Sequence, residues 1–121
     1  MHYFSAISII NALISVQLYN SLHMNKIKKY AVVGHPIEHS KSPQIHQSFA
    51  DEFGIQLIYE RIDIALGTFS KQVMAIKKEG YLGLNVTLPY KKDAFKICNQ
   101  LSKKSKFTES VNTISFNGEK F

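Results

Sequence analysis

The chain has 121 residues, of which 45% are hydrophobic and 20% are charged, and its formal net charge is +6 at pH 7. These values are typical of one small globular domain, and the length is too short for two. Its single cysteine, Cys98, excludes an internal disulfide framework, and the apolar residues before it predict a small core side chain rather than a reactive thiol.

The positive charge is dispersed along the sequence. Nearly all the basic residues are lysines, and Arg61 is the lone arginine, although bidentate recognition of phosphate or guanine favours arginine. A nucleic-acid interface would need its basic residues gathered on one face, together with a recognisable motif. We therefore expect no nucleic-acid partner, and an anionic small molecule explains part of the charge equally well.

The first 23 residues, Met1–His23, are apolar and contain no lysine or arginine, unlike the lysine-rich chain after them. They lack the basic start and the cleavage site of a secretory signal, and polar residues interrupt the apolar run that a membrane span needs. Met24 begins a stretch typical of a cytosolic protein. We expect residues 1–23 to be an upstream extension outside the fold, with a weak membrane anchor or an added amphipathic helix as alternatives. From Met24 onward we expect a cytoplasmic domain with no membrane partner.

The first predicted strand is Lys29–Gly34, a run of β-forming residues that stops at a glycine. The loop after it leads to Ser42–Pro43, where a capping serine followed by proline predicts the start of a helix. This helix should run to about Phe53. Ile45, Phe49 and Phe53 recur every four residues and predict its core face.

The rest of the chain continues to alternate between strands and helices. We expect a strand at Leu57–Ile62, a helix at Phe69–Glu79, a strand at Gly83–Thr87, a helix from Lys91 to about Leu101, a strand at Val111–Phe116 and a hairpin turn at Asn117–Gly118. This order predicts an α/β fold, a three-layer αβα domain with a mostly parallel sheet.

Polar residues lie where such a sheet binds ligands, beyond the carboxyl ends of its strands. Ser40 and Ser42 lie at a helix N-terminus, whose free N–H groups and positive dipole end favour a carboxylate. Thr87 and Lys91 follow the third strand, and Asn112 lies in the fourth. All five can converge on one edge, but alternatives stay open: Ser42 could only cap its helix, Lys91 could be solvated, and the other polar groups could join loops.

Other kinds of site find no support in the sequence. The spacing of His35, His39 and His46 matches no zinc signature, so we expect no metal. The glycine-rich loop of dinucleotide-binding folds and the nucleophile elbow of hydrolases are both absent.

Three segments resemble, in the same order, the motifs of the shikimate dehydrogenases. They are Tyr30–Pro43 with His46 after it, Gly83–Lys91 and Ser110–Ile114, and the resemblance covers roughly Lys28 to Phe121. It implies the substrate-binding domain of a two-domain, NADP-dependent dehydrogenase that reduces 3-dehydroshikimate to shikimate, a step on the route to aromatic amino acids.

The resemblance also implies roles for single residues. Ser40 and Ser42 would hold the shikimate carboxylate, Thr87, Lys91 and Asn112 would contact its ring hydroxyls, and Lys91 would be the catalytic lysine. In the family, this lysine works with an aspartate from an Asn-Thr-Asp-Gly segment, and a Rossmann-type domain binds NADP. The chain stops at Phe121, before both.

We therefore expect residues 24–121 to form a shikimate dehydrogenase-like substrate-binding domain that binds shikimate or 3-dehydroshikimate but is inactive alone. NADP would be bound mainly by the absent domain, and the full-length parent could form a homodimer. The alternative is a non-catalytic sugar-acid-binding domain or a degenerate gene fragment. One departure from the family is Glu109, which stands where relatives more often have a small residue.

Overall fold

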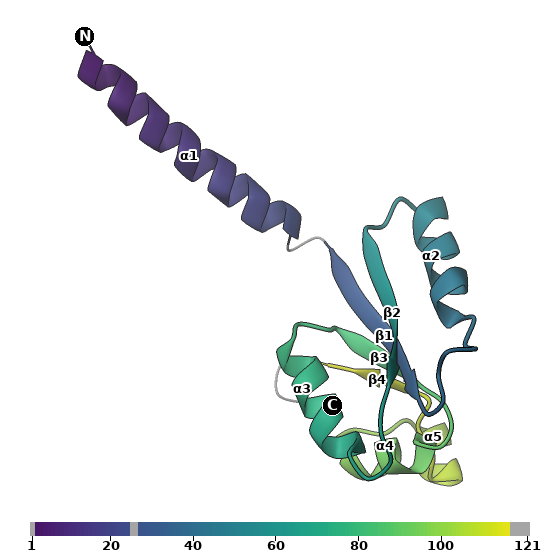
Figure 1. Ribbon diagram of the computed structural model, residues 1–121. Coiled ribbons are helices and arrows are strands. Elements are labelled where there is room, and N and C mark those ends of the chain that lie inside the picture. Colours follow the sequence, from purple (N-terminus) through teal and green to yellow (C-terminus); the bar gives the residue numbers. More distant parts are fainter. Residues whose placement is uncertain (1, 25–26, 117–121) are drawn as a thin grey trace.

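The computed structural model describes residues 2–24 and 27–116, and within the first helix it describes the side chains of residues 8–19. The predicted hairpin turn Asn117–Gly118 lies outside the described residues. A long helix, α1 (His2–Met24), extends away from a domain built around one sheet (Figure 1). No helix in the described part of the chain is long and apolar enough to cross a membrane.

The sheet is mostly parallel, as the alternating pattern predicts. It has four strands in the order β2-β1-β3-β4, namely β1 (Lys28–Gly34), β2 (Leu57–Asp63), β3 (Gly83–Val86) and β4 (Thr113–Ser115). Strand β1 pairs in parallel with β2 and β3, and β4 runs antiparallel to β3. The carboxyl ends of β1, β2 and β3 therefore lie at one edge of the sheet, where the start of β4 joins them.

Helices cover both faces of the sheet, which confirms the three-layer α/β arrangement. Helix α2 (Ser42–Glu52) packs on one face against β1 and β2. On the other face lie α3 (Phe69–Lys78) and α4 (Lys91–Ile97), which contact each other. A short helix, α5 (Lys103–Thr108), connects α4 to β4.

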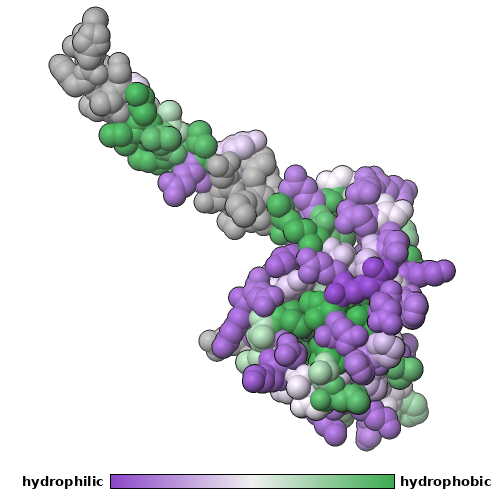
Figure 2. All heavy atoms as spheres, in the orientation of Figure 1, coloured by the Kyte–Doolittle hydropathy of each residue, from purple (hydrophilic) through white to green (hydrophobic). Residues whose placement is uncertain are grey.

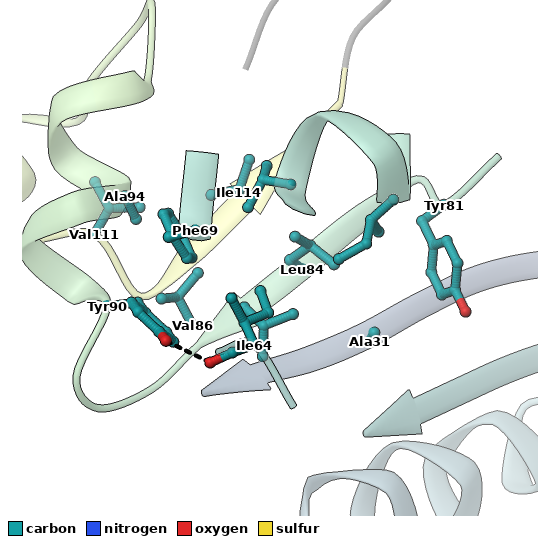
Figure 3. Packing of buried hydrophobic residues seen from close by; sticks show 13 residues of the cluster. Ala31, Ile64, Phe69, Tyr81, Leu84, Val86, Tyr90, Ala94, Val111 and Ile114 are labelled. Carbon is teal, nitrogen blue, oxygen red and sulfur yellow. Dashed lines mark hydrogen bonds between the residues drawn. The ribbon is translucent and has the colours of Figure 1, made fainter. Parts of the chain in front are cut away.

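The core lies between the sheet and the α3–α4 layer. Its members are at most 5% exposed, and Figure 3 shows them converging from the strands and from both helices: Ala31, Val33, Ile64, Phe69, Val73, Ile76, Tyr81, Leu84, Val86, Tyr90, Ala94, Val111 and Ile114. The Tyr90 hydroxyl donates a hydrogen bond to the Ile64 carbonyl, so this buried phenol is satisfied. Cys98 is half-buried and packs against this core, and burial raises the pKa of its thiol.

The core face predicted for α2 is wrong. Ile45, Phe49 and Phe53 are 52%, 55% and 72% exposed, and Ala50 is the residue of this helix that is buried. Apolar periodicity identifies a face of a helix but not the surface that covers it. Helix α2 lies toward the β2 side of the sheet and turns a small residue inward, which leaves the larger side chains outside. Figure 2 shows further apolar surface along the described middle of α1.

The segment after β3 also differs from the prediction: the helix predicted for Lys91–Leu101 is shorter, and a second helix lies after it where none was predicted. Helix α4 ends at Ile97, since Cys98 adopts an extended backbone with φ −76° and ψ 133°. Helix α5 starts at a new cap, where the Ser102 hydroxyl accepts a hydrogen bond from the Ser105 N–H at 3.1 Å. Lys103, Lys104 and Lys106 therefore lie on a helix.

Candidate functional site

The loops that follow β1 and β3 meet at one edge of the sheet. The His35 N–H donates to the Leu88 carbonyl at 3.1 Å, and the Thr87 N–H donates to the Val33 carbonyl at 3.0 Å. Gly34 makes this approach feasible, because a Cβ at this position would lie 2.7 Å from Thr87 Cγ2 and 2.9 Å from the Leu88 oxygen. The first two motifs are thus joined through backbone contacts.

The segment that contains Ser40 and Ser42, which we call the serine loop, differs from the capping arrangement predicted for Ser42. Ser42 is the first residue of α2 rather than its cap, and the side chain of Lys41, which precedes it, makes no capping hydrogen bond. The Ser40 hydroxyl instead accepts a hydrogen bond from the Ser42 N–H at 3.3 Å. The role predicted for Ser42 as the cap is therefore wrong: Ser40 satisfies this N–H, and the Ser42 hydroxyl is released for another partner.

Arg61, a residue of β2, donates hydrogen bonds to the same loop and to α2. Its Nε donates to the Ser40 carbonyl at 2.8 Å and its Nη2 donates to Gln44 Oε1 at 2.9 Å. One guanidinium thus holds both the loop and the first turn of α2, as the fixed fork of arginine donors allows.

The partner of Ser42 is Tyr59, a half-buried residue of β2. Burial raises the pKa of the Tyr59 phenol to about 12, and a hydrogen bond with the Ser42 side chain acts in the opposite direction. The Tyr59 ring stacks on His46 of α2, with ring centroids 4.4 Å apart and planes 7° from parallel. The phenol is therefore protonated at neutral pH and fixed in orientation.

A row of hydrogen bonds runs from Tyr59 across the sheet to β4. The Tyr59 hydroxyl donates to Asn85 Oδ1 at 2.5 Å, and Asn85 Nδ2 donates to Thr113 Oγ1 at 3.2 Å. The Thr113 hydroxyl then donates to Asn112 Oδ1 at 3.3 Å. We call these four side chains the polar row. Because Tyr59 stacks on His46 of α2, Tyr59, Asn85 and Thr113 lie on the α2 face of the sheet, and Asn112 lies one residue before β4.

Three hollows border the polar row. One of about 560 Å³ has Tyr59 and Arg61 in its lining. A second, of about 290 Å³, lies on the α2 face, and its polar lining includes His46, Tyr59, Asn85 and Thr113. The smallest, of about 150 Å³, is lined by Lys91, Lys104, Ser105, Thr108, Ser110 and Asn112. Asn112 is therefore common to the polar row and to the hollow that contains Lys91.

The structure places the predicted site residues in two groups that meet at Asn112. Ser40 and Ser42 connect to the polar row through Tyr59, and Lys91 shares the smaller hollow with Asn112. Thr87 lies at the end of β3, against Gly34.

Three further residues of the site, Tyr59, Arg61 and Thr113, were missed by sequence reasoning. Tyr59 and Arg61 alternate on one face of β2, and this alternation was the available signal. Asn85 is a polar residue inside the predicted strand Gly83–Thr87, and this was the signal available for it. The partner of each side chain depends on strand register, since Asn85 is opposite Val32 on one side and Thr113 on the other.

The three histidines His35, His39 and His46 have different partners in the structure. His35 Nδ1 lies 2.6 Å from Asp63 Oδ1, His39 lies near Glu38 at 3.8 Å, and His46 stacks on Tyr59. Within the residues that the structure describes, no group of three or more potential ligands could hold a metal ion.

Comparisons with known proteins agree with this arrangement. The family model described as shikimate dehydrogenase substrate binding domain matches residues 32–114. The shikimate dehydrogenase (NADP(+)) of Acinetobacter baylyi is 42% identical over 87 residues, which are 72% of this chain and 33% of the relative. The chain thus spans about a third of the length of the curated relatives that it matches.

Solved structures show the same fold. Shikimate dehydrogenase 1 of Peptoclostridium difficile matches with a TM-score of 0.73 and 34% identity, over 77% of this chain and 34% of the other. Shikimate 5-dehydrogenase from Thermus thermophilus, solved in complex with shikimate, matches with a TM-score of 0.69 and 30% identity, over 73% and 34% of the two chains. With the three motifs gathered at one sheet edge, the chain belongs to the family of shikimate dehydrogenase substrate-binding domains.

Proposed function

We propose that this chain is the substrate-binding part of an NADP-dependent shikimate dehydrogenase and that it binds shikimate and 3-dehydroshikimate. The observation that carries the proposal is that the polar row connects the serine loop, at Tyr59, with the hollow that contains Lys91, at Asn112. Curated relatives bear the name shikimate dehydrogenase (NADP(+)), and one similar structure is a complex with shikimate.

In this proposal each group of residues binds one end of the ligand. Ser40 and Ser42, at the start of α2, hold the carboxylate, since N-terminal N–H groups and hydroxyls favour an anion. Thr87, Lys91 and Asn112 contact the ring hydroxyls. Lys91 Nζ donates to a hydroxyl oxygen and exchanges a proton with it during the reaction.

The described residues do not fit the NADP cofactor. A dinucleotide loop needs glycines that let phosphates approach the backbone, whereas His35 and Pro36 follow β1 here. The space beside Gly34 is filled by Thr87 and the Leu88 carbonyl. We therefore propose that NADP binds mainly to a part of the full-length enzyme outside these residues, and we derive no hydride step from them. A cytoplasmic location and a homodimer of the parent stay predictions.

Ligand-detected NMR titration of the 121-residue chain with shikimate tests the proposal. Cyclohexenecarboxylate, which lacks the ring hydroxyls, serves as the comparison ligand. Ser42→Ala should weaken the binding of both ligands. Lys91→Ala should weaken the binding of shikimate alone, by about tenfold or more, since a hydrogen bond to a charged group is lost. Lys71→Ala, which changes an exposed lysine of α3, is the matched control.

Two outcomes would contradict the proposal. Absence of shikimate binding to the unmodified chain would contradict the proposed function itself. Equal binding by Lys91→Ala and Lys71→Ala would exclude Lys91 from the site. We also expect no NADP-dependent oxidation of shikimate by this chain, which spans about a third of its relatives, and turnover above background would show that the described residues suffice for catalysis.

A further inference from the structure

Tyr59 stands at the junction of the two halves of the site. Its phenol contacts the Ser42 side chain on the serine loop and Asn85 on β3. Its ring is held in place by stacking on His46, which belongs to the same helix as Ser42. Through these contacts one side chain of β2 connects α2, β3 and, by way of the polar row, β4.

The polar row has a direction, and Tyr59 sets it. A protonated phenol can donate one hydrogen bond, and here it donates to Asn85 Oδ1. This fixes the orientation of the Asn85 amide, so that Nδ2 points to Thr113 and the Thr113 hydroxyl points to Asn112 Oδ1. Nδ2 remains as the side-chain donor with which Asn112 can bind a ligand oxygen.

The other neutral phenols of the domain do not have this position. The Tyr81 hydroxyl donates to Glu60 Oε2 at 2.5 Å, and the Tyr90 hydroxyl donates to a backbone carbonyl in the core. Neither contacts a residue of the serine loop or the polar row through these bonds. A short hydrogen bond is thus common among these tyrosines, but only that of Tyr59 leads to the candidate site.

We propose that Tyr59 is a positioning residue of the substrate site, whose hydroxyl orients Asn85, Thr113 and Asn112 in series and holds the Ser42 hydroxyl beside them. The proposal rests on the proposed function for the identity of the ligand. It deepens that function, because it makes recognition of the carboxylate and of the ring hydroxyls depend on one side chain of β2.

Tyr59→Phe tests the proposal, because it removes the hydroxyl and keeps the ring that stacks on His46. Tyr81→Phe is the matched control, since it removes an equally short hydrogen bond away from the site. Shikimate affinity is measured by NMR titration, and the side-chain amide signals of Asn85 and Asn112 are followed in the ligand-free chain. Thr113→Val breaks the row one link further on and serves as a second variant.

We expect Tyr59→Phe and Thr113→Val each to weaken shikimate binding by about tenfold, and Tyr81→Phe to change it by less than about twofold. The Asn112 amide signal should shift in both row variants, although Asn85 and Thr113 separate Tyr59 from it. Such a shift reports the orientation of the row, and general loss of packing would instead move core signals as well.

The outcomes separate this inference from the proposed function. If Ser42→Ala weakens shikimate binding but Tyr59→Phe binds like the unmodified chain, the function stands and the role of Tyr59 is wrong. If the unmodified chain does not bind shikimate, the proposed function fails. The Asn112 signal then decides: a shift in Tyr59→Phe supports positioning by Tyr59, and an unchanged signal overturns it.

Discussion

Glu109 combines an unfavourable backbone conformation with a position close to the site. It ends α5 with φ 52° and ψ 39°, the left-handed region in which a side chain is strained and glycine is not. It lies two residues before Val111, whose N–H donates to the Lys91 carbonyl at 2.9 Å. This conformation favours glycine at position 109.

Replacement of Glu109 by glycine should therefore stabilise the domain. We expect Glu109→Gly to increase the free energy of unfolding by about 0.5–1 kcal/mol, because relief of strain exceeds the added flexibility of the unfolded chain. Glu79→Gly is the control, since Glu79 also ends a helix but has φ −75°, and it should destabilise. Urea denaturation measures both, and destabilisation by Glu109→Gly would contradict the argument.

At the scale of elements, the two serines at the N-terminus of α2 have different hydrogen-bond partners. Ser40 Oγ accepts from the Ser42 N–H, and the Ser42 hydroxyl contacts Tyr59. Arg61 holds the loop by its donation to the Ser40 carbonyl, a contact that needs no serine side chain. Stability of the helix and binding of a ligand can therefore be separated by mutation.

Ser40→Ala should destabilise the domain more than Ser42→Ala. Loss of the hydrogen bond that the Ser40 hydroxyl accepts from the Ser42 N–H is expected to cost about 0.5–1.5 kcal/mol. Ser42→Ala loses no capping bond, so its effect should fall on shikimate affinity instead. Thermal unfolding of both variants, followed by circular dichroism, provides the comparison. A larger loss for Ser42→Ala would restore Ser42 as the cap and contradict the hydrogen bonds described here.

At the scale of the whole molecule, α1 lies apart from the domain (Figure 1). Its large apolar side chains are exposed in the described residues 8–19, with Ile9 at 58%, Leu13 at 63% and Ile14 at 51%. Most helical stability in proteins comes from packing of an apolar face against other elements. The core, in contrast, is assembled from residues 31–114 alone.

Removal of residues 1–23 should accordingly leave the domain folded. The far-ultraviolet signal should fall by the contribution of α1, while the midpoint and cooperativity of thermal unfolding stay unchanged. Near-ultraviolet circular dichroism also loses the contributions of Tyr3 and Tyr19, so the thermal midpoint is the deciding measurement. Loss of cooperative unfolding in the truncated chain would show that α1 packs on the domain, and residues 1–23 would then belong to the fold.

Much of the fold was predictable because it depends on local patterns. Strand and helix periods, glycine stops and the order of elements predicted a mostly parallel α/β sheet, and three motifs predicted the family. The division of the segment after Lys91 into α4 and α5 was not predicted. A single extended residue, Cys98, ends the first helix, and Ser102 caps the second.

What only the tertiary structure decided are the partners of each side chain. Spacing in the sequence pointed to Ser40, Ser42, Lys91 and Asn112, but it contains no information on strand register or on the surface that covers a helix. The polar row through Tyr59 exists because β2, β1, β3 and β4 pair in one register, which places Asn85 opposite Thr113. Register is a property of paired strands, and a shift of one residue would turn these side chains to the opposite face of the sheet.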